Sequence, residues 1–197
     1  MSEMNVEDQV RKLHSRGQWE RIINLGTNEE DDEGRRLLWF WPSLDDLNWI
    51  KNVIEDYRLR GIASIGCGSG LLEWIIQQYS GCDVVGVEAD KSWWSSVYSP
   101  PQFLKRTIFI DNEDADVRVP LDYALLFCYF NNGRAFYNYM NNYAGKVVIV
   151  IGPDVGQNRT TDPLPFDKKF KELGWKIQNA RKLDNRKDFA AVYTRYK

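Results

Sequence analysis

Three glycines and one carboxylate form the pattern with the clearest chemical meaning in this chain. Gly66, Gly68 and Gly70 follow an apolar run, and Glu88 ends a second apolar run 22 residues after Gly66. Alternating glycines allow a sharp turn and let a ligand lie against bare backbone, while amides at the start of the next helix point toward that ligand. An acid at this spacing reaches the hydroxyl pair of a ribose. The sequence therefore predicts a site for an adenosine-containing cofactor.

The spacing of the glycines selects among such cofactors. A nicotinamide-binding turn needs G-x-G-x-x-G, but Leu71 occupies the position of the third glycine. The chain also lacks the Gly-Lys-Ser/Thr of a P-loop. A nicotinamide-dependent oxidoreductase is therefore disfavoured. The remaining alternative to a cofactor turn is a strand–helix turn that needs glycine for steric reasons only.

The G-x-G-x-G turn followed by an acid at the end of the next strand resembles the class I S-adenosylmethionine-dependent methyltransferases. In that family the glycine turn holds the methionine part of the cofactor and the acid binds the ribose. Members usually carry an acid two residues before the first glycine, where this chain has Ser64. The resemblance also implies that Trp93 or Trp94 flanks the adenine, and that Asp111 or Asn112 lies near it unless they are solvated loop residues. The implied cofactor site is Gly66, Cys67, Gly68, Gly70, Glu88, Ala89, Trp93, Asp111 and Asn112.

The family places groups that face the methyl acceptor after the fourth strand. Here the run Phe130-Asn131-Asn132 follows an apolar stretch that ends at Cys128. Phe130 could stack on a planar substrate, and Asn131 or Asn132 could orient an amine, although asparagine is also a favoured helix cap. The catalytic candidates are therefore Phe130, Asn131 and Asn132. Cys128 is better explained as a small apolar strand residue than as a nucleophile.

Apolar runs and amphipathic segments alternate through most of the chain, which predicts an α/β fold. We expect a doubly wound, mostly parallel seven-stranded sheet with an antiparallel edge hairpin and helices on both faces. Helices are expected at 44–59 and 71–79, at 91–98 as a short helix or turn, on the segment with Phe136 and Tyr143, and on that with Phe166 and Phe170. The expected strands are 62–66, 83–88, 107–110, 123–128 and 146–151, then one that opens at 175–177 and one at 189–193.

Length and composition fit a single domain at 37–197, preceded by a polar and acidic extension at 1–36. Hydrophobic residues make up 43% of the chain, which excludes a disordered protein. The extension contains a possible helix pair and an acidic run at 29–33 that reads as a solvated linker or a lid. His14, the single histidine, lies in this region, and no metal-type cysteine pair occurs, so no metal site is expected. Without a secretory signal or membrane span, the expected location is intracellular, either cytoplasmic or nuclear.

Two functions compete at this stage. The first is an S-adenosylmethionine-dependent methyltransferase that acts on a small molecule, a protein or an RNA. The second is a catalytically inactive relative that serves as a cofactor sensor or an interaction scaffold. Ser64 in place of an acid and the absence of a family signature after the fourth strand motivate the second. Its protein partner would meet residues 152–164 or the acidic run, and neither hypothesis involves a membrane.

Overall fold

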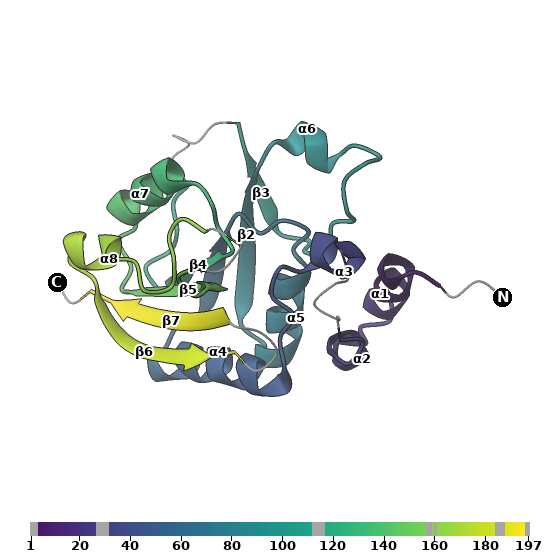
Figure 1. Ribbon diagram of the computed structural model, residues 1–197, viewed down its shortest axis with the longest axis horizontal. Coiled ribbons are helices and arrows are strands. Elements are labelled where there is room, and N and C mark those ends of the chain that lie inside the picture. The colour runs from purple at the N-terminus through teal and green to yellow at the C-terminus, as the bar shows by residue number, and fades with distance from the viewer. Residues whose placement is uncertain are drawn as a thin grey trace.

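Seven strands form one sheet in the order β3-β2-β1-β4-β5-β7-β6 (Figure 1). The computed structural model describes residues 4–26, 32–111, 117–156, 159, 161–183 and 188–195, with the backbone alone for 32 and 33. Neighbouring strands from β3 to β5 run parallel, while β7 is antiparallel to both β5 and β6. The predicted sheet, including its antiparallel edge pair, is confirmed. The strands are β1 Gly61–Ile65, β2 Asp83–Ala89, β3 Thr107–Ile110, β4 Tyr123–Cys128, β5 Val147–Pro153, β6 Lys176–Lys182 and β7 Asp188–Thr194.

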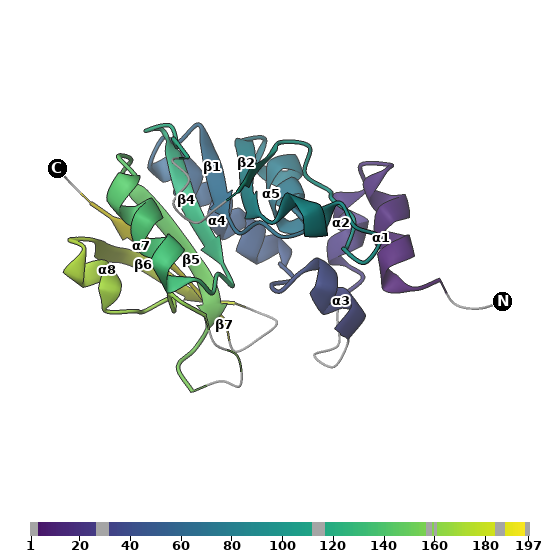
Figure 2. The same ribbon diagram turned by 90° about the horizontal axis from the view of Figure 1, so that it is seen from above.

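Alternate residues of the central strands face two separate hydrophobic clusters. Ile62 and Leu126 belong to the cluster shared with the helices before β2, whereas Ala63 and Leu125 belong to the cluster shared with the helices after β4. This period of two follows from the pleat of a strand buried on both faces. Figure 2 shows the helical layers on either side of the sheet. The helices are α1 Val6–His14, α2 Trp19–Ile23, α3 Asp32–Leu37, α4 Leu44–Asp56, α5 Leu71–Ser80, α6 Lys91–Trp94, α7 Gly133–Asn142 and α8 Lys169–Glu172.

The helix pair expected near the N-terminus packs onto the same cluster as α4 and α5. Val10 and Ile22 are fully buried in it, and the Trp41 Nε1 donates a hydrogen bond of 3.1 Å to the Ile23 carbonyl. His14 packs on Trp74 with ring centroids 4.4 Å apart, and its Nε2 lies 3.1 Å from the Phe103 carbonyl oxygen. Residues 6–23 are therefore part of the core, and α1 marks one end of the molecule (Figure 1).

The domain boundary at residue 37 stays a prediction. The acidic run falls partly on residues 29–31, outside the described residues. Helix α3 begins directly after them, at Asp32. None of the helices in the described part of the chain is long and apolar enough to cross a membrane.

Three predicted elements differ in detail. Helix α4 ends at Asp56 because Arg58 adopts a left-handed backbone with φ of 51°. Gly61 opens β1 instead of ending that helix, and a Cβ at Gly61 would lie 2.3 Å from the Asp83 carbonyl oxygen. The helix expected around Phe166 is confined to Lys169–Glu172. Phe166 is 43% exposed and packs edge-on against Phe189 instead of facing inward.

Candidate functional site

A cavity of about 800 Å³ opens at the carboxyl ends of β1, β2 and β4. It is lined by the glycine turn, the β2–α6 junction, residues 35–40 and residues 128–132. Since β1 pairs with β2 on one side and with β4 on the other, the strand order reverses here. Open α/β sheets bind ligands at this reversal. The cavity is therefore the place where this topology positions a ligand.

The turn between β1 and α5 has three glycines in the left-handed region, with φ of 71° at Gly66, 60° at Gly68 and 72° at Gly70. Residues with a Cβ rarely adopt this conformation. A Cβ at Gly70 would lie 2.6 Å from Leu104 Cβ, and one at Gly66 would lie 2.8 Å from the Phe130 ring. At Gly68 the nearest atom would be Trp94 at 3.8 Å. Gly68 thus leaves open backbone toward the cavity, whereas Gly70 serves packing against Leu104.

Glu88 is fastened to the glycine turn. Its Oε2 accepts a hydrogen bond of 2.7 Å from the Gly68 amide, and its Oε1 accepts one of 2.8 Å from the Ala89 amide. Burial raises the pKa of Glu88, and hydrogen bonds from these amides and the Trp94 side chain act in the opposite direction. A carboxylate has roughly four acceptor positions, so at least one remains for a ligand hydroxyl. The turn and the acid form one preorganised unit.

A second carboxylate, that of Glu73, belongs to a residue that lines the cavity. Glu73, in the first turn of α5, is only 2% exposed. Its Oε1 accepts a hydrogen bond of 2.6 Å from the Ser64 hydroxyl on β1. Its Oε2 is buried and has no hydrogen-bond partner among the described residues. Desolvation raises the pKa of Glu73 to about 7, against smaller opposing effects of hydrogen bonds from the Ser64 hydroxyl and from the Glu73 backbone amide. A buried carboxylate oxygen without a partner is costly, so this position points to a ligand.

Aromatic side chains form the mouth of the cavity. Trp39 is 54% exposed and stacks on Tyr129, with centroids 5.7 Å apart and planes at 21°. Tyr129 follows β4 with a left-handed φ of 51°, and its hydroxyl donates to Asp188 Oδ1 at 2.8 Å. Strained backbone of this kind persists only where surrounding contacts hold it. The mouth therefore presents a flat apolar surface beside the glycine turn.

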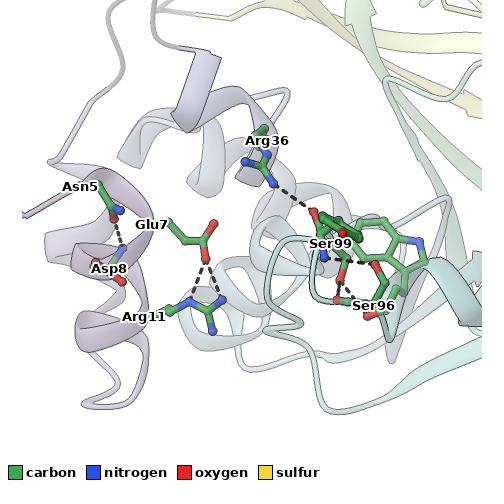
Figure 3. Close-up of polar contacts among 9 residues, drawn as sticks. Asn5, Glu7, Asp8, Arg11, Arg36, Ser96 and Ser99 are labelled. Atoms are coloured by element: carbon green, nitrogen blue, oxygen red, sulfur yellow. Dashed lines mark hydrogen bonds and ion pairs between the residues drawn. The ribbon is translucent and has the colours of Figure 1, made fainter.

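A hydrogen bond links α3 to the segment that follows α6. The Arg36 Nη2 donates a hydrogen bond of 3.2 Å to the Tyr98 carbonyl, and Figure 3 shows Arg36 reaching toward the segment that carries Ser96 and Ser99. The Ser99 hydroxyl contacts the Trp94 and Ser96 carbonyls at 3.0 Å each. Residues before β1 and residues after β2 thus share one wall.

Most residues predicted for the site surround this cavity, although their binding roles stay predictions. Gly70 and Asp111 do not belong to its lining among the described residues: Gly70 faces Leu104, and Asp111 is exposed at the end of β3. Asn112 lies outside the described residues. The predicted residues that do line the cavity are Gly66, Cys67, Gly68, Glu88, Ala89, Trp93, Phe130, Asn131 and Asn132.

The asparagine alternatives are now distinguishable. Asn132 Oδ1 accepts a hydrogen bond of 3.0 Å from the Ala135 amide and caps α7. Asn131 is exposed and pairs through its backbone with Asp162, which leaves its side chain at the cavity edge. Burial raises the pKa of the Cys128 thiol well above its usual range. A protonated thiol is a poor nucleophile, which agrees with an apolar role for Cys128.

Sequence reasoning missed Glu73. The signal was present, because Glu73 is the one acid in the otherwise apolar run 71–76, where every residue is buried. A charged residue at a fully buried helix position needs a partner. Trp39 and Tyr129, which also line the cavity, were not among the residues predicted for the site. In the described parts of the chain, no group of acids, cysteines or histidines is arranged to hold a metal ion.

Comparisons with known proteins identify the fold. No protein-family model matches the chain, and no curated protein is similar to it in sequence. Among solved structures it is similar to magnesium protoporphyrin IX methyltransferase from Synechocystis PCC 6803 with bound S-adenosylmethionine, with a TM-score of 0.55, 12% identity and 100% of both chains covered. A putative caffeoyl-CoA O-methyltransferase from Staphylococcus aureus gives 0.52 and 15%, covering 95% of this chain and 98% of that one. A putative RNA methyltransferase from Pyrococcus horikoshii gives 0.50 and 14%, covering 98% and 97%.

These likenesses define the class of architecture. The chain has the fold of the class I S-adenosylmethionine-dependent methyltransferases, as its glycine turn and strand-two acid predicted. At these identities the sequence is a divergent example of that fold.

Proposed function

We propose that this chain is an S-adenosylmethionine-dependent methyltransferase whose cofactor binds in the cavity at the ends of β1, β2 and β4. The observation that carries the proposal is the hydrogen bond between Glu88 and the Gly68 amide. It holds the acid expected to bind ribose against the turn expected to bind the methionine part. The comparison enzyme from Synechocystis binds S-adenosylmethionine and S-adenosylhomocysteine within the same fold.

The residues present fit this cofactor. Gly68 offers backbone without a nearby side chain, Glu88 retains an acceptor position, and Trp93 lies on the cavity wall, 43% exposed, where a flat ring could lie against it. When bound, S-adenosylmethionine supplies an electrophilic methyl group. The chain's own contribution is to orient that group toward the acceptor and to exclude water.

The acceptor would enter beside Trp39, Tyr129 and Phe130. These three rings line the cavity, and Trp39 stacks on Tyr129. Because Asn132 is engaged in capping α7, Asn131 and Phe130 are the stronger candidates for contact with the acceptor. The three comparison proteins are named for a porphyrin, a coenzyme A ester and an RNA, so the fold accommodates acceptors of different classes. Small molecules, proteins and RNA are therefore all to be tested as methyl acceptors.

Calorimetry with S-adenosylmethionine and S-adenosylhomocysteine tests the cofactor. We expect binding to the wild-type chain, a roughly 10- to 100-fold loss in Glu88→Gln, and no change in Glu55→Gln, an acid on α4 outside the cavity lining. No binding at millimolar ligand would end the proposal. Transfer of a labelled methyl group into fractions of a cell extract then tests catalysis. Binding without transfer into any fraction would favour the cofactor sensor.

A further inference from the structure

The buried carboxylate of Glu73 has a role that the proposed cofactor site does not yet explain. It is 2% exposed, lines the cavity, and keeps one oxygen without a hydrogen-bond partner among the described residues. No described lysine or arginine interacts electrostatically with the Glu73 carboxylate. The charged group that does so is Glu88, which has the same sign. The ionised form of Glu73 therefore has no compensating positive charge among the described residues, in a buried position where an isolated charge is strongly disfavoured.

Glu73 lies beside Ser64, the position on β1 where class I methyltransferases usually carry an acid. Ser64 stands two residues before Gly66, on the β1 face that meets α5. Its hydroxyl donates to Glu73 Oε1 at 2.6 Å, so a carboxylate supplied by the helix reaches the place where β1 carries none. Ser64 fixes one oxygen; the other oxygen is buried without a partner among the described residues, and Glu73 is one of the residues that line the cavity.

We infer that Glu73 binds the ammonium group of the cofactor's amino-acid tail through its free Oε2. The inference rests on the proposed function, because it needs a ligand whose tail lies on the glycine turn. An ammonium group has three donors and a positive charge, and so it satisfies both the unpaired oxygen and the uncompensated charge. A ligand without that tail would leave Glu73 as it is.

Proton release provides a signature of this contact. Burial and the like charge of Glu88 raise the pKa of Glu73 to about 7. The other ionisable groups that act with it are the Cys67 and Cys128 thiols, whose own pKa values burial raises, so both stay neutral at pH 7. A fraction of the Glu73 side chains therefore carries a proton at that pH. An arriving ammonium group favours the ionised carboxylate and expels that proton to solvent.

Two ligands separate the tail from the nucleoside. S-adenosylhomocysteine carries the ammonium-bearing tail, whereas 5′-methylthioadenosine has the adenosine and thioether without it. Calorimetry at pH 7 in buffers of different ionisation enthalpy should show release of a fraction of a proton with the first ligand and almost none with the second. Glu73→Gln should weaken S-adenosylhomocysteine roughly 10- to 100-fold, abolish its proton release and leave 5′-methylthioadenosine nearly unchanged. Glu88→Gln, the matched control, should weaken both ligands.

The outcomes separate this inference from the proposal beneath it. If neither ligand binds the wild-type chain, the proposed function fails and the inference fails with it. If both bind and Glu73→Gln binds S-adenosylhomocysteine as tightly as the wild type, the inference alone is wrong. Should Glu73→Gln not fold, the wild-type measurement still decides, because equal proton release with the two ligands would overturn the role of Glu73.

Discussion

Alanine at Gly70 should destabilise the chain more than alanine at Gly81, although both glycines have a φ of 72°. The backbone strain of a left-handed alanine, about 1–2 kcal/mol, is common to the two substitutions. At Gly81, which ends α5, a Cβ would meet no atom within 4 Å. At Gly70 it would lie 2.6 Å from Leu104 Cβ and 3.1 Å from the Leu104 backbone nitrogen. Overpacking of this kind adds about 1–3 kcal/mol, so we expect about 2–5 kcal/mol in total at Gly70.

Urea unfolding followed by tryptophan fluorescence measures both variants. The wild type and both variants are fitted with the same slope of unfolding free energy against urea concentration, because neither substitution should change the surface exposed on unfolding. Subtracting the Gly81→Ala loss from the Gly70→Ala loss isolates the clash with Leu104. If the two variants lose the same free energy of unfolding, the packing role of Gly70 is wrong, and Gly70 would be as open to added side chains as Gly81.

Three further predictions test the core, the cap and the buried acid. Trp41→Phe leaves the Ile23 carbonyl unpaired and should lower the free energy of unfolding in urea by about 1–3 kcal/mol; an unchanged value would contradict anchoring of α2. Asn132→Ala should cost about 1 kcal/mol through loss of the α7 cap, and Asn132→Ser should recover most of it; equal losses would argue against capping. Burial raises the Glu73 pKa from 4.5 to about 7, so between these values the folded chain holds a proton that the unfolded chain has lost. Wild-type stability relative to Glu73→Gln should therefore fall by about 3 kcal/mol as pH rises from 4.5 to 7.5, and a constant difference would disprove the shift.

The sheet was predictable because its signals are local. Runs such as 123–128 and 147–151 are apolar throughout, as strands covered on both faces must be, and the glycine turn separates β1 from α5 without ambiguity. Element ends depend on contacts between distant segments and were less accessible. At the start of β1, position 61 needs glycine because a Cβ there would collide with the Asp83 carbonyl oxygen and the Tyr123 ring. Phe166 contacts Phe189 on β7, and helical spacing alone cannot reveal that contact.

The site was predictable only where one motif specifies it. Gly68 and Glu88 lie 20 residues apart, yet their types and spacing indicate one function, and the structure joins them by a hydrogen bond. Glu73 stands out in the sequence as the one acid in an apolar run, but its role could not be assigned from the sequence, because that role depends on the contact with Ser64 on β1 and on burial. Spacing along a helix does not report burial, and burial gives this carboxylate its chemistry.

The glycine turn is tethered to segments on both sides of it in the chain. The Ser69 hydroxyl donates a hydrogen bond of 2.8 Å to the Leu37 carbonyl, and the Ser69 backbone carbonyl accepts one of 2.8 Å from the Phe103 amide. The Phe103 carbonyl in turn meets His14 on α1. A shortened chain without α1 would lose the His14 contact with Phe103, and Phe103 is the residue that is hydrogen-bonded to Ser69 in the glycine turn. Affinities measured on such a fragment would describe a loosened loop, so ligand screening calls for protein with its first helix intact.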